Sequence, residues 1–261
     1  YYDIFLTKWN SEGTNEWTKQ WGTVETEGGY SVTTDIDGSI FVAGHTNGSF
    51  DENINLGNND VFLTKWNSDG KKEWTKQWGT GESDYGHSVI VDSSGNIFVA
   101  GCTKGAFADS TNSGDNDVFL TKWNSGGTRE WTRQIGTSGD DCGNSVAVDA
   151  IGNIFVTGYT MGSLDGNVND GDYDAFLTKW NSEGTREWTK QLGTVGNDYG
   201  YGVAVDRDEN ILVTGYTEGS LNGNKNTGKS DIFLTKWNSD GTEIWTKQWG
   251  TTSEEYGVSV E

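Results

Sequence analysis

The chain is a tandem repeat. Its motif Asp-Ile-Phe-Leu-Thr-Lys-Trp-Asn at residues 3–10 returns with small changes every 57 residues, without insertion or deletion. Such periods predict solenoids, propellers or arrays, because each unit can bury its hydrophobic face only against its neighbours. We therefore predict one domain over residues 1–261. Its repeats are 3–59, 60–116, 117–173, 174–230 and the partial repeat 231–261.

Each repeat contains four short segments that favour β-structure, and none has the 3.6-residue period of a helix. The segments are clearest in residues 3–10, 16–21, 96–101 and 145–149. Four short antiparallel strands make one blade of a β-propeller, so we predict an all-β propeller fold. A β-solenoid is the alternative, although its coils are shorter and do not contain two hairpins.

The side chains also predict the order of the strands within a blade. Segment 145–149 is small enough for the crowded centre, whereas the Trp-rich segment 16–21 suits the wide outer rim. We expect a five-bladed ring whose last blade combines residues 3–21 with residues 256–261 and lacks one strand. Such an edge invites a neighbouring chain, so the open blade offers a route to self-association. A longer parent protein with more blades would explain the missing strand equally well.

The repeat resembles a known family. The segments that carry the resemblance are residues 200–206 (Gly-Tyr-Gly-Val-Ala-Val-Asp), 153–160, 162–169 and 174–180. They are similar to the bacterial β-propeller repeat called SBBP, and the similarity extends over the whole chain. It implies a propeller of a secreted or surface-associated bacterial protein, without a catalytic signature. We therefore expect an extracellular or cell-surface location.

Charge and hydropathy exclude several functions. The net charge is −21, which argues against nucleic acid and anionic membrane surfaces as partners. No apolar run is long enough to cross a bilayer, so we expect no membrane insertion. Because the sequence has 38 glycines and no proline, its turns depend on Gly, Asn and Asp. The chain begins within a repeat, which suggests a piece of a longer product.

The long loops of the repeats carry oxygen side chains at alternate positions, a pattern that hard cations such as calcium can use. The candidate calcium ligands are Asp51, Asn53 and Asn55 in one loop and Asp165, Asn167, Asn169 and Asp174 in another. The glycine falls one position too late for a standard calcium loop, and no Glu closes it. The alternative is plain Asx-turn chemistry, which we favour.

Superposition of the repeats brings variable side chains together at the blade junctions. There the end of one blade's second strand should lie near the start of the next blade's first strand. The candidate ligand-binding residues are His45, Asp84, Tyr85, Tyr159, Asp198, Tyr199, Tyr201, Tyr216, Glu255 and Tyr256. Aromatic faces with a few polar groups are typical of small-ligand or sugar pockets. The alternative is that these side chains only fill gaps between blades.

The second junction should hold Cys102, Asp141, Cys142 and Asn144, and the two cysteines either form a disulfide or stay unpaired, which we favour. His45 and His87 alone do not make a metal site. The tryptophans are expected to pack blade against blade, in two series. They are Trp9, Trp66, Trp123, Trp180 and Trp237, and Trp17, Trp74, Trp131, Trp188 and Trp245. The Lys8 series beside them should keep its ammonium groups in solvent.

These features predict a binding module rather than an enzyme. An active site needs one asymmetric cluster of titratable groups, whereas these copies differ little and show no triad or carboxylate pair. Repetition favours multivalent binding of a protein or carbohydrate partner at the junctions. The competing hypothesis is a structural scaffold without a small ligand, which assembles through its incomplete blade. We expect no cofactor other than calcium.

Overall fold

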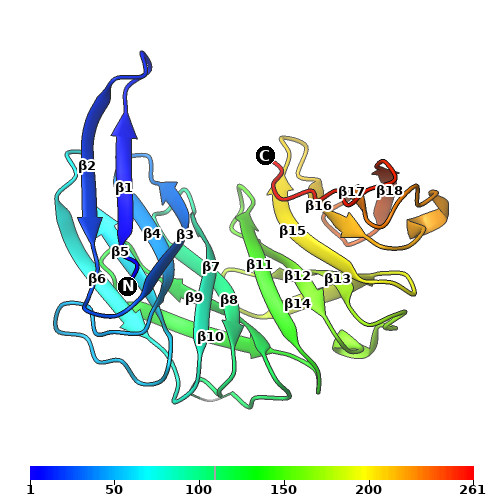
Figure 1. Ribbon diagram of the computed structural model, residues 1–261, viewed down its shortest axis with the longest axis horizontal. Helices are drawn as coiled ribbons and strands as arrows, with labels where there is room; N and C mark the ends of the chain where they lie inside the picture. The colour runs from blue at the N-terminus through cyan, green and yellow to red at the C-terminus, as the bar shows by residue number, and fades with distance from the viewer. Residues whose placement is uncertain (109) are drawn as a thin grey trace.

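The computed structural model describes residues 1–108 and 110–261, and it consists of antiparallel sheets joined by loops (Figure 1). Four sheets have four strands each, and one has two. The strands are β1 (Ile4–Trp9), β2 (Asn15–Trp21), β3 (Glu27–Thr34), β4 (Ile40–Thr46), β5 (Asp60–Trp66), β6 (Lys72–Trp78), β7 (Asp84–Val91), β8 (Ile97–Thr103), β9 (Asp117–Trp123), β10 (Arg129–Ile135), β11 (Asp141–Val148), β12 (Ile154–Thr160), β13 (Asp174–Trp180), β14 (Arg186–Leu192), β15 (Asp198–Val205), β16 (Ile211–Thr217), β17 (Asp231–Trp237) and β18 (Glu243–Trp249). The prediction of a propeller built from four-stranded antiparallel blades is confirmed.

The complete blades are β3–β6, β7–β10, β11–β14 and β15–β18, numbered one to four below. Their first strands lie side by side around the centre, and Ser31, Ser88 and Ser145 each tie one first strand to the next. The Ser88 hydroxyl, for example, accepts a hydrogen bond from the Val146 amide at 3.2 Å. The predicted order of strands from centre to rim is therefore correct.

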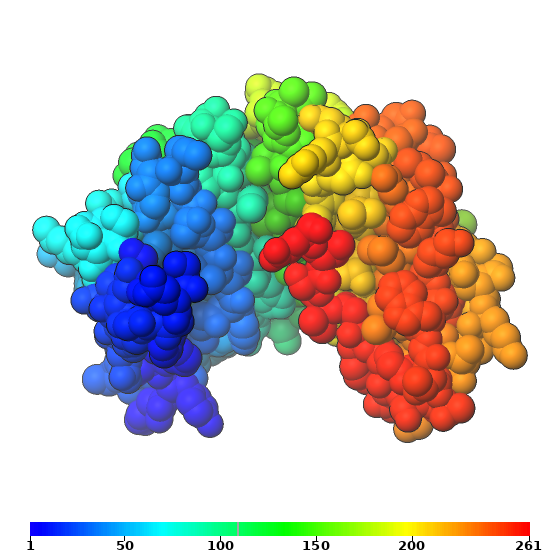
Figure 2. Space-filling view, turned by 90° about the horizontal axis from the view of Figure 1, so that it is seen from above, coloured from blue at the N-terminus to red at the C-terminus, as the bar shows by residue number. Residues whose placement is uncertain are grey.

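The incomplete unit is a two-stranded sheet, β1–β2, at the N-terminal end. Residues 256–261, expected to be its innermost strand, form no strand and lie against blade four, where the Gly257 amide donates to the Gly215 carbonyl at 3.3 Å. Figure 2 shows an open arc, with the N-terminal (blue) and C-terminal (red) ends on either side of a gap. The two parts of the fifth blade do not meet, because nothing between them supplies the second strand.

The core lies between the blades. Phe62, Phe119, Phe176 and Phe233 occupy one position of the repeat, and none has any exposed surface. Trp66 packs on Trp21 of the preceding unit with ring centroids 4.9 Å apart, and Trp123 packs on Trp78 in the same way. The expected packing of tryptophans from blade to blade is therefore confirmed for this series, except at Trp9, which is 58% exposed.

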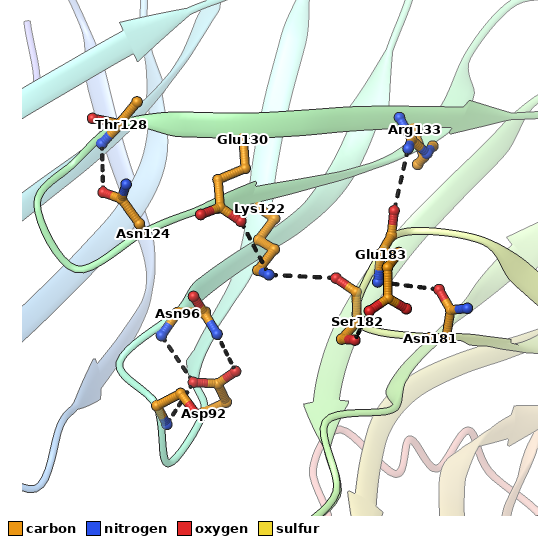
Figure 3. A network of polar contacts seen from close by, with 11 residues as sticks. Asp92, Asn96, Lys122, Asn124, Thr128, Glu130, Arg133, Asn181, Ser182 and Glu183 are labelled. Atoms are coloured by element: carbon orange, nitrogen blue, oxygen red, sulfur yellow. Dashed lines mark hydrogen bonds and ion pairs between the residues drawn. The ribbon is translucent and has the colours of Figure 1, made fainter.

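The prediction that the Lys8 series keeps its ammonium groups in solvent is wrong for the inner copies. Lys122 is only 12% exposed, forms an ion pair with Glu130 at 3.0 Å and donates to the Ser182 carbonyl of the next blade (Figure 3). Lys179 repeats both contacts with Glu187 and Ser239. The Lys122 ammonium lies over the Phe98 ring at 6.0 Å, and the blade-to-blade spacing brings a carbonyl within reach of the charge. These lysines therefore join neighbouring blades.

In residues 1–108 and 110–261 the helical elements are two short 3-10 turns, Leu164–Gly166 and Leu221–Gly223. Among the residues that the structure describes, no helix has the length and apolarity needed to cross a membrane.

Candidate functional site

A β-bulge in each first strand defines the inner face of the arc. In the β3–β4 ladder Gly29 pairs with Gly44 and Ser31 pairs with Ala43, so Tyr30 has no partner. The same irregularity leaves His87, Asn144 and Tyr201 unpaired in the other three blades. A bulge re-aims its extra side chain away from the pleat. These four residues, together with Val258, line a central cavity of about 570 Å³.

The strand pairing beside each bulge depends on a glycine. A Cβ built at Gly158 would lie 1.8 Å from the Cys142 carbonyl oxygen, and one at Gly101 would lie 1.8 Å from the Tyr85 carbonyl oxygen. No other residue fits so close to a partner strand. All four blades therefore present their variable side chains on one common backbone frame.

The first junction, between blades one and two, combines histidine and tyrosine. The His45 ring lies 5.0 Å from Tyr85 and 5.3 Å from Tyr30, measured between centroids. His87 approaches Tyr30 to 5.6 Å. Burial lowers the pKa of His45, the nearby His87 adds to this effect, and Glu27 opposes it. His45 is therefore neutral at physiological pH and behaves as part of an aromatic surface.

The third and fourth junctions form one tyrosine cluster. Tyr199 lies 4.8 Å from Tyr159 and 5.1 Å from Tyr216, with the Tyr216 ring nearly parallel to it. Tyr201 lies 5.9 Å from Tyr216, and Tyr256 meets Tyr216 edge to face at 4.8 Å. Burial raises the pKa of Tyr159, Tyr199 and Tyr216 above the usual value, so these hydroxyls remain neutral donors.

The second junction has a different chemistry. Cys102 and Cys142 are buried free thiols, so the disulfide alternative is not what the structure shows. His87 lies between the first and second junctions, with its Nδ1 3.7 Å from the Cys142 Sγ and 3.4 Å from the Asn144 Oδ1. A hydrogen bond from Cys142 lowers the pKa of Cys102 despite its burial. Burial raises the pKa of Cys142.

The acids predicted beside these rings hold the frame instead of facing the cavity. Asp84 and Asp198 have no exposed surface. The Asp84 carboxylate accepts the Thr80 amide at 2.6 Å, and Asp198 accepts the Thr194 amide at 2.6 Å. Burial raises the pKa of both carboxyls to about 6. Glu255 caps the loop at Thr251 in the same manner at 2.9 Å.

The first candidate calcium loop is held by bonds within blade one. The Asp51 carboxylate pairs with Lys72 at 2.7 Å. The Asn53 amide donates to the Phe50 carbonyl at 2.9 Å, while the Asn55 oxygen accepts the Gly57 amide at 3.0 Å. These three side chains serve separate partners, as the Asx-turn alternative expects.

The second candidate loop shows the same arrangement. Asp165 pairs with Arg186, and the Asn167 amide donates to the Leu164 carbonyl at 2.7 Å. The Asn169 amide donates to the Gly171 carbonyl, while Asp174 is buried and accepts the Gln191 amide at 2.9 Å. Calcium binding at either loop stays a prediction.

The candidate ligand-binding residues predicted from the sequence did not include Tyr30 and Tyr173, although both lie on the inner face. Tyr30 is the repeat equivalent of His87 and Tyr201, so superposition at 57 residues places it in the cavity lining. The Tyr173 ring centroid lies 5.2 Å from that of Tyr199. Tyr173 belongs to the loop just before β13, outside the predicted strands. The 57-residue period was therefore enough to place Tyr30, whereas placing Tyr173 required knowledge of the loop conformation.

A larger cavity of about 790 Å³ lies at the outer rim and includes Arg129, Arg133 and Arg186. Two of these cations already have partners. Arg133 donates to the Gly184 carbonyl at 2.8 Å, and Arg186 pairs with Asp165. The inner face is therefore the better candidate site, because its variable side chains are not committed to the frame.

Together the blades and the repeated inner face define a β-propeller repeat protein. The family model for the SBBP β-propeller repeat matches residues 16–51, 73–108, 130–165 and 187–222, which is more than half of the chain. The chain therefore belongs to the SBBP β-propeller repeat family, as its resemblance implied.

Two curated proteins are similar to the chain. The regulatory protein FlaEY of Caulobacter vibrioides is 26% identical over 200 residues, which covers 69% of this chain and 21% of that protein. An uncharacterized WD repeat-containing protein of Acanthamoeba polyphaga mimivirus is 24% identical and covers 91% of this chain and 23% of its own length. The chain thus spans less than a quarter of each relative.

Among solved structures, a Bacteroides caccae protein of unknown function aligns over 97% of this chain and 98% of its own, with 11% identity and a TM-score of 0.45. A glucose dehydrogenase aligns over 88% of this chain and 70% of its own, with 11% identity and a TM-score of 0.43. Similarity at this level carries no argument about activity.

Proposed function

We propose that this propeller is a non-enzymatic binding module whose inner face recognises a partner protein. The observation that carries the proposal is the band of aromatic residues that follows the bulges around the centre. Its members are Tyr30, His45, Tyr85, His87, Tyr159, Tyr173, Tyr199, Tyr201, Tyr216 and Tyr256. Tyr30 is 58% exposed and Tyr256 49%. Tyrosine is enriched at protein interfaces because it supplies a large contact area with a polar end.

The names of the relatives support the same class. One is called a regulatory protein and the other a WD repeat-containing protein. Because the four junctions differ in side chains, we infer one continuous and asymmetric surface rather than a set of equivalent sites. A carbohydrate partner uses the same rings by stacking, so it is the alternative occupant of this face. An extracellular or cell-surface location belongs to the proposal, and antibody labelling of intact cells tests it.

The test is selection of a displayed random peptide library on the intact chain, followed by affinity measurement of the selected peptides. A Tyr201→Asn plus Tyr256→Ser variant removes two rings of the band, and we expect affinity to fall at least about 10-fold. The matched control is Trp249→Ser at the outer rim, because Trp249 has the same 49% exposure as Tyr256. Equal loss in the control contradicts the proposal, and binding on a glycan array alone identifies the carbohydrate alternative.

A second candidate is assembly through the β1 edge, and one observation favours it. Phe5 is 73% exposed, whereas its repeat equivalents Phe62 and Phe119 are fully buried. Beside it, a groove of about 430 Å³ is lined by Leu6, Trp9 and other residues of the first unit. Among the described residues, β1 pairs only with β2, so a strand can be added there. Concentration-dependent association in light scattering that Phe5→Lys abolishes would support this function.

A further inference from the structure

A cluster of three metal-ligating atoms lies at the second junction. A ring nitrogen of His87, the Cys102 Sγ and the Cys142 Sγ all lie within 4.8 Å of one another, and among the described residues they are the one such group found. We propose that these three side chains bind a single Zn²⁺ ion. The site shares His87 with the proposed partner surface, but it differs in chemistry because two sulfur atoms accompany that imidazole.

The geometry of the cluster fits a tetrahedral ion. Zinc binds thiolate at about 2.3 Å and imidazole nitrogen at about 2.0 Å, which separates two ligand atoms by roughly 3.5–3.8 Å. The distance from the Cys142 Sγ to the His87 Nδ1 is 3.7 Å. This separation lies within the range that two ligands of one zinc ion require.

The ligand types select the metal. Thiolate and imidazole favour zinc, whereas calcium and magnesium need oxygen ligands. Cys102 and Cys142 are 5% and 1% exposed, so neighbouring side chains hold them in place. Zinc binding releases the thiol protons to solvent.

The three ligands come from two blades. His87 and Cys102 lie on β7 and β8 of blade two, whereas Cys142 begins blade three on β11. His87 is the bulged residue, and this irregularity is what turns its ring toward the neighbouring blade. A bound ion would therefore join two blades at the centre of the arc and raise the stability of the fold.

A fourth coordination position faces the central cavity. The Asn144 Oδ1 lies 3.4 Å from the His87 Nδ1, and both residues line this cavity. Two cysteines and one histidine with an open fourth position are a known form of zinc site. The Asn144 oxygen or a donor from the cavity can complete the coordination.

The proposed metal site occurs once in the chain, whereas features of the repeat occur in every blade. The equivalents of Cys102 are His45, Tyr159 and Tyr216, and those of Cys142 include Tyr85 and Tyr199. No other junction therefore offers two sulfurs to a cation. We expect one ion per chain.

The experiment uses the full chain, reduced and free of oxygen, with two thiols confirmed by titration. Co²⁺ is added as a spectroscopic probe and then displaced with Zn²⁺. We expect one equivalent of Co²⁺ with tetrahedral visible bands and a thiolate-to-cobalt charge-transfer band. We also expect a higher melting temperature with Zn²⁺.

Two variants and one control test the ligands. Cys142→Ser and His87→Asn should each lower Zn²⁺ affinity at least about 100-fold, since even changes outside the ligand shell cost about 10–100-fold. His87→Asn introduces the residue that the next repeat carries at Asn144, which keeps a measurable fold if Cys142→Ser does not fold. The control is His45→Asn, which removes the other histidine and should leave affinity unchanged.

Three results would overturn the proposal. The first is the absence of a thiolate-to-cobalt band in the reduced protein. The second is Zn²⁺ affinity that both variants leave unchanged or that the control lowers equally. The third is binding of Cu⁺ without any binding of Zn²⁺.

Discussion

The second and third junctions share a backbone and differ in chemistry. In blade three Cys142 pairs with Tyr159, and in blade four Tyr199 pairs with Tyr216 in the same register. The second junction places two thiols beside an imidazole, whereas the third places two phenol rings in tilted contact, with centroids 4.8 Å apart. The comparison shows that the repeat fixes where side chains project, and that a few substitutions decide what each junction can bind.

The buried polar contacts of the blades, in contrast, are the same from copy to copy. Gln134 and Gln191 occupy the same repeat position, and each amide donates to a buried aspartate, Asp117 or Asp174. These contacts are identical at both blades because a buried carboxylate without donors would be costly. At these buried positions the copies agree, whereas the side chains of the inner edge differ from blade to blade.

The largest effect should come from filling the glycine position of the shared frame. Gly101→Ala and Gly158→Ala each place a Cβ against a partner carbonyl, so we expect a loss of unfolding free energy of about 3 kcal/mol or more in both. Urea denaturation measures this loss. Gly81→Ala is the control, since no atom lies within 4 Å of its Cβ. A clear difference between the two blades would show that their frames are not equivalent.

A smaller effect is expected from pH. Burial raises the pKa of Asp84 and Asp198 to about 6, from an unfolded value of 3.8. The stabilising contribution of these protonated carboxyls is therefore complete below the unfolded pKa and is lost as pH rises through about 6. The loss is at most about 3 kcal/mol for each carboxyl.

Unfolding free energies measured from about pH 4 to pH 7 test this dependence. Asp198→Asn should reduce the pH dependence of the unfolding free energy by the contribution of one carboxyl. Asp84→Asn should reduce it by a similar amount. A stability that rises over this range, or variants that do not change the slope, would contradict the assignment of these buried carboxyls.

The smallest effect on stability is expected at the bulge itself. Tyr201→Asn gives blade four the residue that blade three carries at Asn144, and Tyr201 points into the cavity rather than the core. The unfolding free energy should change by less than about 0.5 kcal/mol. Thermal melting of the variant beside the native chain measures it. A large loss would mean that the ring supports the frame, which would remove it from the proposed binding surface.

The period of the sequence predicted the fold because every repeat obeys the same local rules. The buried Trp66 and the small first strands followed from alternation and size. The position of Lys122 did not, since a contact with Ser182 depends on the spacing between blades. The strand expected at residues 256–261 is absent because no second strand is present to pair with it.

The candidate site was predicted in outline only. Superposition correctly grouped Tyr159 with Tyr199, and Cys102 with Cys142. From the sequence, His87 was considered only beside His45, whereas the structure also brings its Nδ1 to Cys142 of the second junction. A one-residue bulge reverses the direction of a side chain, and nothing in the alternation of the sequence marks where it occurs.

The most direct test of the account is anomalous diffraction at the zinc edge from crystals of the reduced chain grown with Zn²⁺. A single strong peak among the side chains of His87, Cys102 and Cys142, with none at the equivalent points of the other junctions, is the predicted result. An empty second junction, or peaks of equal height at several junctions, would contradict the claim that one frame carries different chemistry at each blade.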